Sequence, residues 1–138
     1  LYSDVNIPTY KTSGSSGLDL EAFIGEDLML KPNNTILVPT GLSVAIEDGL
    51  EIQIRPRSGL AAKNMISVLN TPGTIDADYR GEIKVILINL GKDNFTIKTS
   101  ERIAQMVVCP IITANFEIVD ELPPALRGTS GFGSTWQT

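Results

Sequence analysis

The chain has 138 residues, 42% hydrophobic and 20% charged, which is the composition of one globular domain. It has no histidine and one cysteine, Cys109, which excludes an internal disulfide framework, a Cys/His zinc site and Ser-His-Asp or Cys-His catalysis. A net charge of −5 argues against broad nucleic-acid binding, and no apolar run approaches the roughly 20 residues that span a bilayer. We therefore expect a cytoplasmic domain whose chemistry uses carboxylates, hydroxyls, Lys, Tyr or a hard cation.

Short runs of β-branched and aliphatic residues recur along the chain, and turn sequences such as KPNN, PTG, EDG and TPG separate them. This spacing favours an all-β sandwich, jelly roll or barrel over alternating βαβ units. The sequence SGLAAKNM predicts one short helix over residues 58–65. The predicted strands cover residues 18–23, 35–39, 42–47, 50–56, 82–89, 95–98, 102–112 and 115–120.

The predicted strand EIKVILIN is apolar on both faces. Ile83, Val85 and Leu87 point one way, whereas Ile86 and Ile88 point the other way. A small antiparallel domain normally exposes one face of its sheet to water, so this strand favours a subunit interface over an unusually central position.

The segment RPRSGLA places Arg55 and Arg57 immediately before the predicted helix. Free backbone N–H groups at a helix start attract anions, and an arginine fork suits phosphate. The alternative is a helix capped by Ser58 with solvated arginines. Gln105 lies among apolar neighbours, so its amide is either satisfied within the protein or available to a ligand.

Two further segments have a structural and a functional interpretation. The segment NTPGTIDADYRGEI, residues 70–83, is either a hairpin with solvated acids or one whose backbone edge binds a flat ligand while a carboxylate orients water. The C-terminal RGTSGFGSTW is either a disordered terminus or a mobile arm that wraps a ligand. In the second case Arg127 adds charge and Phe132 covers an aromatic ring.

Five segments, taken in order, resemble the motifs of the homotrimeric dUTP pyrophosphatases (dUTPases): SSGLDLEA, RPRSGLA, LNTPGTIDADYRGEI, ERIAQMVV and RGTSGFGST. The resemblance implies a distorted jelly-roll or β-barrel with one short helix, assembled as a homotrimer. Residues 1–126 would form this domain, and residues 127–138 a flexible arm exchanged onto a neighbouring subunit. The implied activity is hydrolysis of dUTP to dUMP and pyrophosphate, which supplies dUMP for thymidylate synthesis and keeps uracil out of DNA.

The same resemblance implies roles for residues of the hairpin. Asp76 would activate the attacking water, and Tyr79 would pack beneath deoxyribose and exclude a ribose 2′-hydroxyl. Phe132 of the arm would cover the uracil. The uracil and deoxyribose would contact Asn70, Gly73, Thr74, Ile75, Tyr79 and Phe132.

Phosphate binding would involve a second group of residues and a metal ion. Mg²⁺ would bind the three phosphates and be held through water by Asp19. The phosphates would contact Arg57, Ser58, Gly59, Gln105, Arg127, Gly133, Ser134 and Thr135.

One residue departs from the family pattern, because Trp136 replaces the glycine that usually ends the last motif. Two alternatives to hydrolysis are a catalytically idle dUTP-binding or regulatory protein and a dCTP deaminase. Asp76 and the complete last motif argue against the first. Ile86, at the position of the deaminase glutamate, argues against the second.

Overall fold

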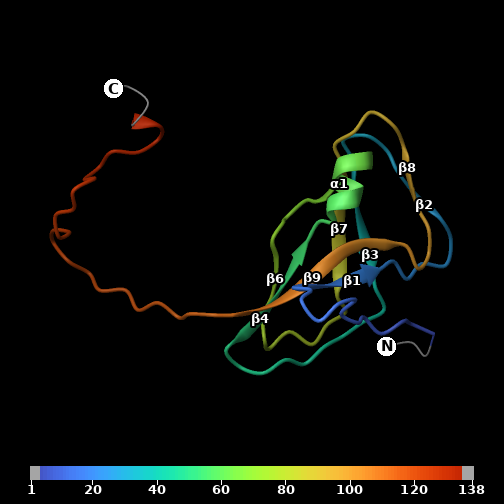
Figure 1. The fold of residues 1–138 in the computed structure, drawn as a ribbon, viewed down its shortest axis with the longest axis horizontal. Helices are drawn as coiled ribbons and strands as arrows, with labels where there is room; N and C mark the ends of the chain where they lie inside the picture. The colour runs from blue at the N-terminus through green and yellow to red at the C-terminus, as the bar shows by residue number, and fades with distance from the viewer. Residues whose placement is uncertain (1–3, 135–138) are drawn as a thin grey trace.

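The computed structural model describes residues 4–134, which form a mostly β protein with one short helix (Figure 1). The helix, α1, spans Ser58–Asn64. The strands are β1 (Gly17–Glu21), β2 (Leu28–Leu30), β3 (Thr35–Pro39), β4 (Leu50–Arg55), β5 (Ile66–Val68), β6 (Gly73–Ile75), β7 (Lys84–Asn89), β8 (Phe95–Ile97) and β9 (Arg102–Pro110).

Across residues 4–134 the strands form three antiparallel sheets, with orders β1-β9-β4-β6, β3-β7-β5 and β2-β8. Alternate residues of the strands point into one core to which all three sheets contribute, because successive side chains of a strand face opposite sides. Leu20, Leu87 and Ile97, one from each sheet, are 0% exposed. Over the same residues, no helix has the length and apolar character needed to cross a membrane.

Most of the predicted elements are confirmed, including the helix and the strands that correspond to β1, β3, β4, β7, β8 and β9. The strand predicted over 42–47 is wrong, although Leu42, Val44 and Ile46 still pack against the core from an irregular backbone. The strand predicted over 115–120 is also wrong, because that segment is exposed and lies outside the sheets. The short strands β2, β5 and β6 were not predicted, because three residues carry little periodicity; β8 is as short, but its β-branched and aromatic residues marked it.

Strand β7 has the two apolar faces that the sequence predicts. Val85 and Leu87 are buried in the core, whereas Ile86 and Ile88 are half-buried on the other side. Ile86 pairs with Leu37 of β3, and its carbonyl accepts a hydrogen bond from the Leu69 N–H at 2.9 Å. Leu37 and Leu69 are each 54% exposed. The sheet β3-β7-β5 therefore has an outer apolar face, formed by Leu37, Leu69, Ile86 and Ile88.

Beyond β9 the chain leaves the folded body. The Ile111 N–H still donates to the Gly49 carbonyl at 2.9 Å, but every residue from 112 to 130 is exposed. Figure 1 shows this segment running away from the sheets as a long excursion without strand or helix. We call residues 112–134 the C-terminal extension. It begins well before residue 127, where the last sequence motif starts.

Candidate functional site

An ion-pair cluster joins β1 to the start of α1. Asp19 lies in β1, where its side chain is 23% exposed, and its Oδ1 accepts a hydrogen bond from Arg57 Nε at 3.0 Å. Arg57 immediately precedes the helix, and its side chain is 27% exposed. The other carboxylate oxygen, Oδ2, lies 3.6 Å from Nη1 of Arg102, the first residue of β9. One carboxylate thus contacts two arginines from separate segments.

This cluster borders a small polar depression, which we call the arginine depression. It brings together five residues that the sequence assigned to phosphate and magnesium binding: Asp19, Arg57, Ser58, Gly59 and Gln105. Strand pairing explains part of the grouping, because Asp19 of β1 lies directly opposite Gln105 of β9. Residues that the family resemblance assigned to one role therefore lie together in the fold.

The amide nitrogen of Gln105 has a partner within the protein. This nitrogen, Nε2, donates to the Pro56 carbonyl at 3.0 Å, which ties β9 to the segment before α1. A Cβ at Gly17 would collide with the Gln105 Oε1, so glycine lets the amide lie flat against β1. Internal pairing of Nε2 therefore fixes the amide at the edge of the depression, where its oxygen lies against Gly17.

The alternative in which Ser58 caps the helix is wrong. The N-cap is Arg57, whose backbone is extended, with φ −88° and ψ 132°, and no side chain makes a capping hydrogen bond. Ser58 is instead the first helical residue and is exposed. Its hydroxyl is therefore not used to start the helix.

The hairpin forms a second depression. Strand β6 pairs with β4, and Asp76 follows it on the surface. The hydroxyl of Tyr79 donates to the Glu82 carbonyl at 2.8 Å, and its ring covers Gly81, where any Cβ would collide with the phenol. We call this the hairpin depression; it is lined by Leu37, Thr74, Ile75, Asp76, Tyr79, Ile83 and Lys84.

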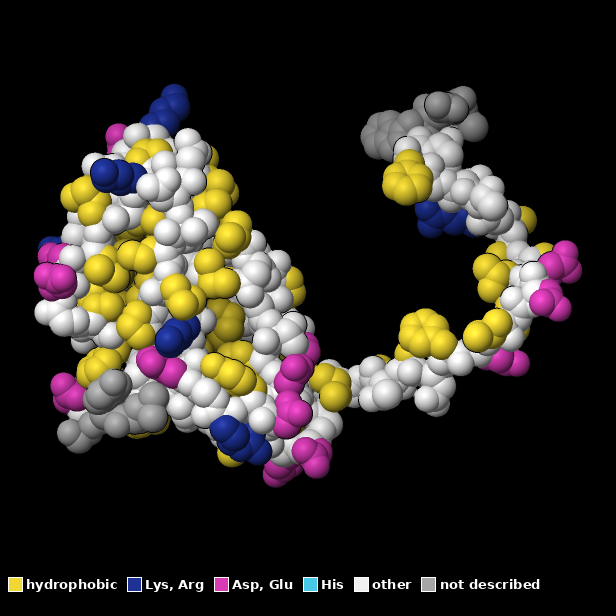
Figure 2. Space-filling model, turned by 180° about the vertical axis from the view of Figure 1, so that it is seen from behind, with side chains coloured by type: hydrophobic (Ala, Val, Ile, Leu, Met, Phe, Trp, Pro, Cys, Tyr) yellow, Lys and Arg dark blue, Asp and Glu magenta, His cyan; other side chains and the backbone are white. Residues whose placement is uncertain are grey.

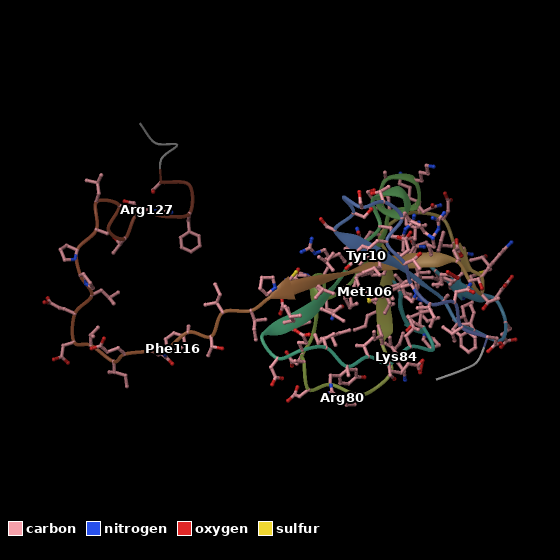
Figure 3. All side chains as sticks on the ribbon, turned by 60° about the horizontal axis from the view of Figure 1, so that its bottom comes forward. Tyr10, Arg80, Lys84, Met106, Phe116 and Arg127 are labelled. Carbon is pink, nitrogen blue, oxygen red and sulfur yellow. The ribbon has the colours of Figure 1, made fainter. Side chains whose placement is uncertain are left out.

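The remaining hairpin residues lie beside this depression. A Cβ built on Gly73 would lie 3.1 Å from Asn70 Nδ2, so these two predicted base-binding residues are adjacent. Arg80 and Lys84, both labelled in Figure 3, lie along one rim of the body. The Arg80 guanidinium donates to the Ala77 carbonyl at 2.6 Å, which closes the turn that follows Asp76.

A single chain does not bring all the predicted site residues together. The arginine and hairpin depressions have different lining residues. Figure 3 shows Arg127 on the C-terminal extension, far from the body, where its Nε donates locally to the Ser130 carbonyl. Phe132, Gly133 and Ser134 are exposed on the same extension. Thr135 and Trp136 lie outside the described residues.

Sequence reasoning counted Arg102 among five arginines near turn-rich segments, but it did not predict the contact of Arg102 with Asp19. Arg102 stands in the fourth motif three residues before Gln105, but nothing in the pattern ERIAQ distinguishes it from a solvated arginine. Its side chain is 54% exposed, and its backbone carbonyl lies 3.5 Å from Arg57 Nη1. In the register of β1 against β9, Arg102 lies opposite Glu21, and only its side chain reaches Asp19 two residues away.

Comparison with known proteins supports the resemblance seen in the sequence. The family model described as dUTPase matches residues 3–136. A deoxyuridine 5'-triphosphate nucleotidohydrolase of Treponema denticola is 57% identical over 129 residues, covering 94% of this chain and 90% of the relative. One of the same description from Bdellovibrio bacteriovorus is 54% identical over 130 residues, covering 94% and 87%. The chain therefore belongs to the dUTPase family.

Solved structures of the same fold agree with this assignment. The dUTPase of Staphylococcus bacteriophage 80alpha with dUpNHpp has a TM-score of 0.82 and 26% identity, covering 97% of this chain and 94% of the phage chain. A mutant dUTPase of phage phi11 of S. aureus, described as revealing the coordination of a structural Mg(II) ion, has a TM-score of 0.79. At 21% identity over 90% and 95% of the two chains, the second likeness concerns the fold alone.

Proposed function

We propose that this chain hydrolyses dUTP to dUMP and pyrophosphate. The observation that carries this function is the match to the dUTPase family over residues 3–136, with more than half of the residues identical to nucleotidohydrolases of dUTP. The geometry supports it, because the chain presents a carboxylate beside one depression and arginines beside another.

In this proposal the hairpin recognises the deoxyuridine part of the substrate. Asn70 and the backbone of Gly73, Thr74 and Ile75 bind the edge of uracil, and the site leaves too little room for the methyl group of thymine. Tyr79 packs beneath the deoxyribose, and its hydrogen bond to Glu82 holds the ring in place. A buried clash rejects a near-identical ligand more strongly than weak attraction selects the right one.

Asp76 is the proposed general base. It is exposed at the end of β6 and borders the hairpin depression, so water can reach its carboxylate. There it accepts a proton from the water that attacks the α-phosphorus, and pyrophosphate leaves on the opposite side. The absence of histidine from the whole chain makes a carboxylate the natural choice for this step.

The phosphates occupy the arginine depression. Arg57 contributes positive charge there, and Ser58, Gly59 and Gln105 contribute polar groups. Arginine suits this task because its fork of N–H donors matches the oxygens of a phosphate. Arg127, Gly133 and Ser134 add contacts from the C-terminal extension, and Thr135, which follows it in the sequence, adds another.

The described donor groups fit magnesium that is carried by the nucleotide. Among residues 4–134, no three acidic, histidine or cysteine side chains gather into a metal-binding group. Asp19 is a single, partly exposed carboxylate, which suits contact through water with a hydrated ion. Bound to the phosphates, Mg²⁺ would neutralise charge that develops on their oxygens.

A homotrimer would complete the site. One subunit would supply the arginine depression, a second the hairpin depression and a third the extension, which explains why one chain leaves these parts separate. The exposed leucines of the outer apolar face and the apolar side chains of the extension support assembly, because water disfavours such surfaces. Figure 2 shows apolar side chains spaced along the extension between acidic ones. Each subunit of this trimer would be a distorted jelly roll. Its single cysteine, Cys109, is a free thiol, which suits a reducing compartment such as the cytoplasm.

Product analysis tests this function. The purified protein is incubated with Mg²⁺ and dUTP, and in parallel with dTTP, UTP or dCTP, and the nucleotide, pyrophosphate and ammonia produced are measured. We expect equal amounts of dUMP and pyrophosphate from dUTP, and little turnover of the other nucleotides. Tight binding without turnover would indicate an idle binding protein, and ammonia from dCTP a deaminase; either result would overturn the proposal.

A further inference from the structure

Asp19 contacts Arg57 in a way that fixes the direction of the guanidinium. The hydrogen bond is made by Nε, and Nη1 lies 3.5 Å from the Arg102 carbonyl. Neither interaction uses Nη2. We infer that Asp19 is a positioning residue, which holds Arg57 ready for the substrate phosphates whether or not a metal ion is bound. This inference rests on the proposed function for the identity of the ligand only.

Asp19 is well suited to this task because it is itself rigidly placed. Its neighbours in β1, Leu18 and Leu20, are 9% and 0% exposed, and β1 pairs with β9 on both sides of Asp19. The backbone that carries the carboxylate is therefore anchored in the core. Arg57, by contrast, stands where β4 has ended and α1 has not begun. Asp19, which is anchored in β1, can therefore orient Arg57, which lies in the connecting segment.

Arginine benefits from such an anchor more than most side chains. Its long side chain has many rotamers, and ordering them on ligand binding costs affinity. A hydrogen bond to Nε in the free protein removes much of that cost beforehand. The result is a preorganised donor at the edge of the arginine depression.

The second oxygen of Asp19 adds to the effect. It lies 3.6 Å from Arg102 Nη1, so the carboxylate is placed between two guanidinium groups. Two cations held near each other repel unless an anion lies between them. Asp19 therefore allows Arg57 and Arg102 to stay near the same depression before any phosphate arrives.

The positioning role can be separated from the role toward magnesium that the family resemblance implies. Contact with a hydrated metal ion affects binding only when the ion is present. Positioning of Arg57 affects binding of the nucleotide in the absence of metal as well. In addition, asparagine keeps an oxygen that can accept the Arg57 Nε–H, whereas alanine removes it. A pure charge effect does not distinguish Asn from Ala.

The test measures binding of the non-hydrolysable analogue dUpNHpp in EDTA by titration calorimetry, for wild type, Asp19→Ala and Asp19→Asn. We expect Asp19→Ala to weaken binding about tenfold and Asp19→Asn to stay within about threefold of wild type. The matched control is Glu21→Ala. It removes an acid of similar exposure from the same face of β1, but Glu21 accepts from Asn6 at 3.0 Å, and we expect no loss of affinity.

Two results in this titration would overturn the inference. One is an Asp19→Ala protein that binds the metal-free analogue as tightly as wild type does. The other is equal weakening by Asp19→Ala and Asp19→Asn, which would assign the effect to charge.

A second measurement does not depend on the nucleotide. In ¹⁵N-edited NMR of the protein alone, the Arg57 Nε–H should exchange slowly with water in wild type and in Asp19→Asn, and fast in Asp19→Ala. Fast exchange in the wild type would overturn the inference. If wild type fails to bind dUpNHpp even with Mg²⁺, the proposed function fails, and this measurement still decides the role of Asp19.

Discussion

The folded body and the C-terminal extension use the same kinds of residue in opposite ways. Leu87 of β7 is 0% exposed, whereas Phe132 of the extension is 112% exposed. The body buries its apolar side chains within its own chain, which stabilises it by about 25 cal/mol for each Å² removed from water. The extension buries almost nothing. Its large apolar side chains are Ile112, Phe116, Ile118, Val119, Leu122, Leu126 and Phe132.

The difference concerns what the apolar side chains of each region can pack against. Segments that stay unfolded by composition have few aromatic and β-branched residues, but the extension has several. An exposed apolar side chain contributes stabilising free energy only when it packs against another surface. The apolar residues of the body pack in its own core, whereas those of the extension have the partner or ligand that we propose for them. Each prediction below changes one side of this comparison.

Removal of residues 127–138 should have the largest effect. Because the extension contributes nothing to the core, the body should stay folded, with a melting temperature within a few degrees of wild type. Hydrolysis of dUTP should fall by more than about 10³-fold, since several proposed phosphate contacts are lost together. Steady-state kinetics and thermal unfolding measure the two effects. Loss of the folded state would show that the body needs these residues for its stability, and would contradict the division into body and extension.

Asp76→Asn changes a residue of the body that is exposed like those of the extension. The amide cannot accept the proton of the attacking water, so kcat should drop about 10²- to 10⁴-fold. Binding of dUpNHpp should change little. Calorimetry and product assays test both parts, and Asp78→Asn, two residues further on, is the matched control. A kcat near that of wild type would remove Asp76 from its proposed role.

Leu87→Ala should mainly affect stability. Truncation of a fully buried leucine leaves a cavity and costs about 2–5 kcal/mol of the free energy of unfolding. Urea denaturation measures this loss, and Leu122→Ala on the extension serves as control, with an expected change below about 0.5 kcal/mol in the same body transition. A cost below 0.5 kcal/mol for Leu87 would contradict the assignment of the core.

Phe132→Ala should have the smallest effect. The stability of the body should not change, while KM for dUTP should rise about tenfold, because an aromatic ring over a base contributes about 1–3 kcal/mol. Phe116→Ala, earlier on the extension, controls for loss of an exposed ring. Equal effects of the two substitutions would assign Phe132 to assembly instead of base binding.

Much of the body could be predicted from the sequence. The longer strands can be recognised because side chains of a strand alternate between its two faces. In β7, for example, Val85 and Leu87 face the core and Ile86 faces outward. The three-residue strand β6 is too short for such a signal, although the hairpin it belongs to carries Asp76. The segment 115–120 has the composition of a strand but no neighbouring strand within its own chain, and pairing cannot be deduced from composition.

The candidate site was predictable in its members but not in its contacts. The five motifs identified Asp19, Arg57 and Gln105, and strand register then brought them together. The contact between Asp19 and Arg102 depends on the direction of the Arg102 side chain, which the motifs do not determine. Ser58 matched the residue preference of a helix cap, yet the chain enters the helix one residue earlier, at Arg57. Boundaries of this kind depend on backbone angles that residue preferences do not determine.

The length of strand β9 sets the distance between the arginine depression and the start of the C-terminal extension. Its nine residues carry Arg102 and Gln105 near one end and release the C-terminal extension at the other, at Pro110. Deletion of one residue from its middle would turn every later side chain to the opposite face and move the departure point by about 3.3 Å. Substitution of single side chains in β9 therefore leaves the departure point of the extension in place, whereas a change in the number of residues moves it.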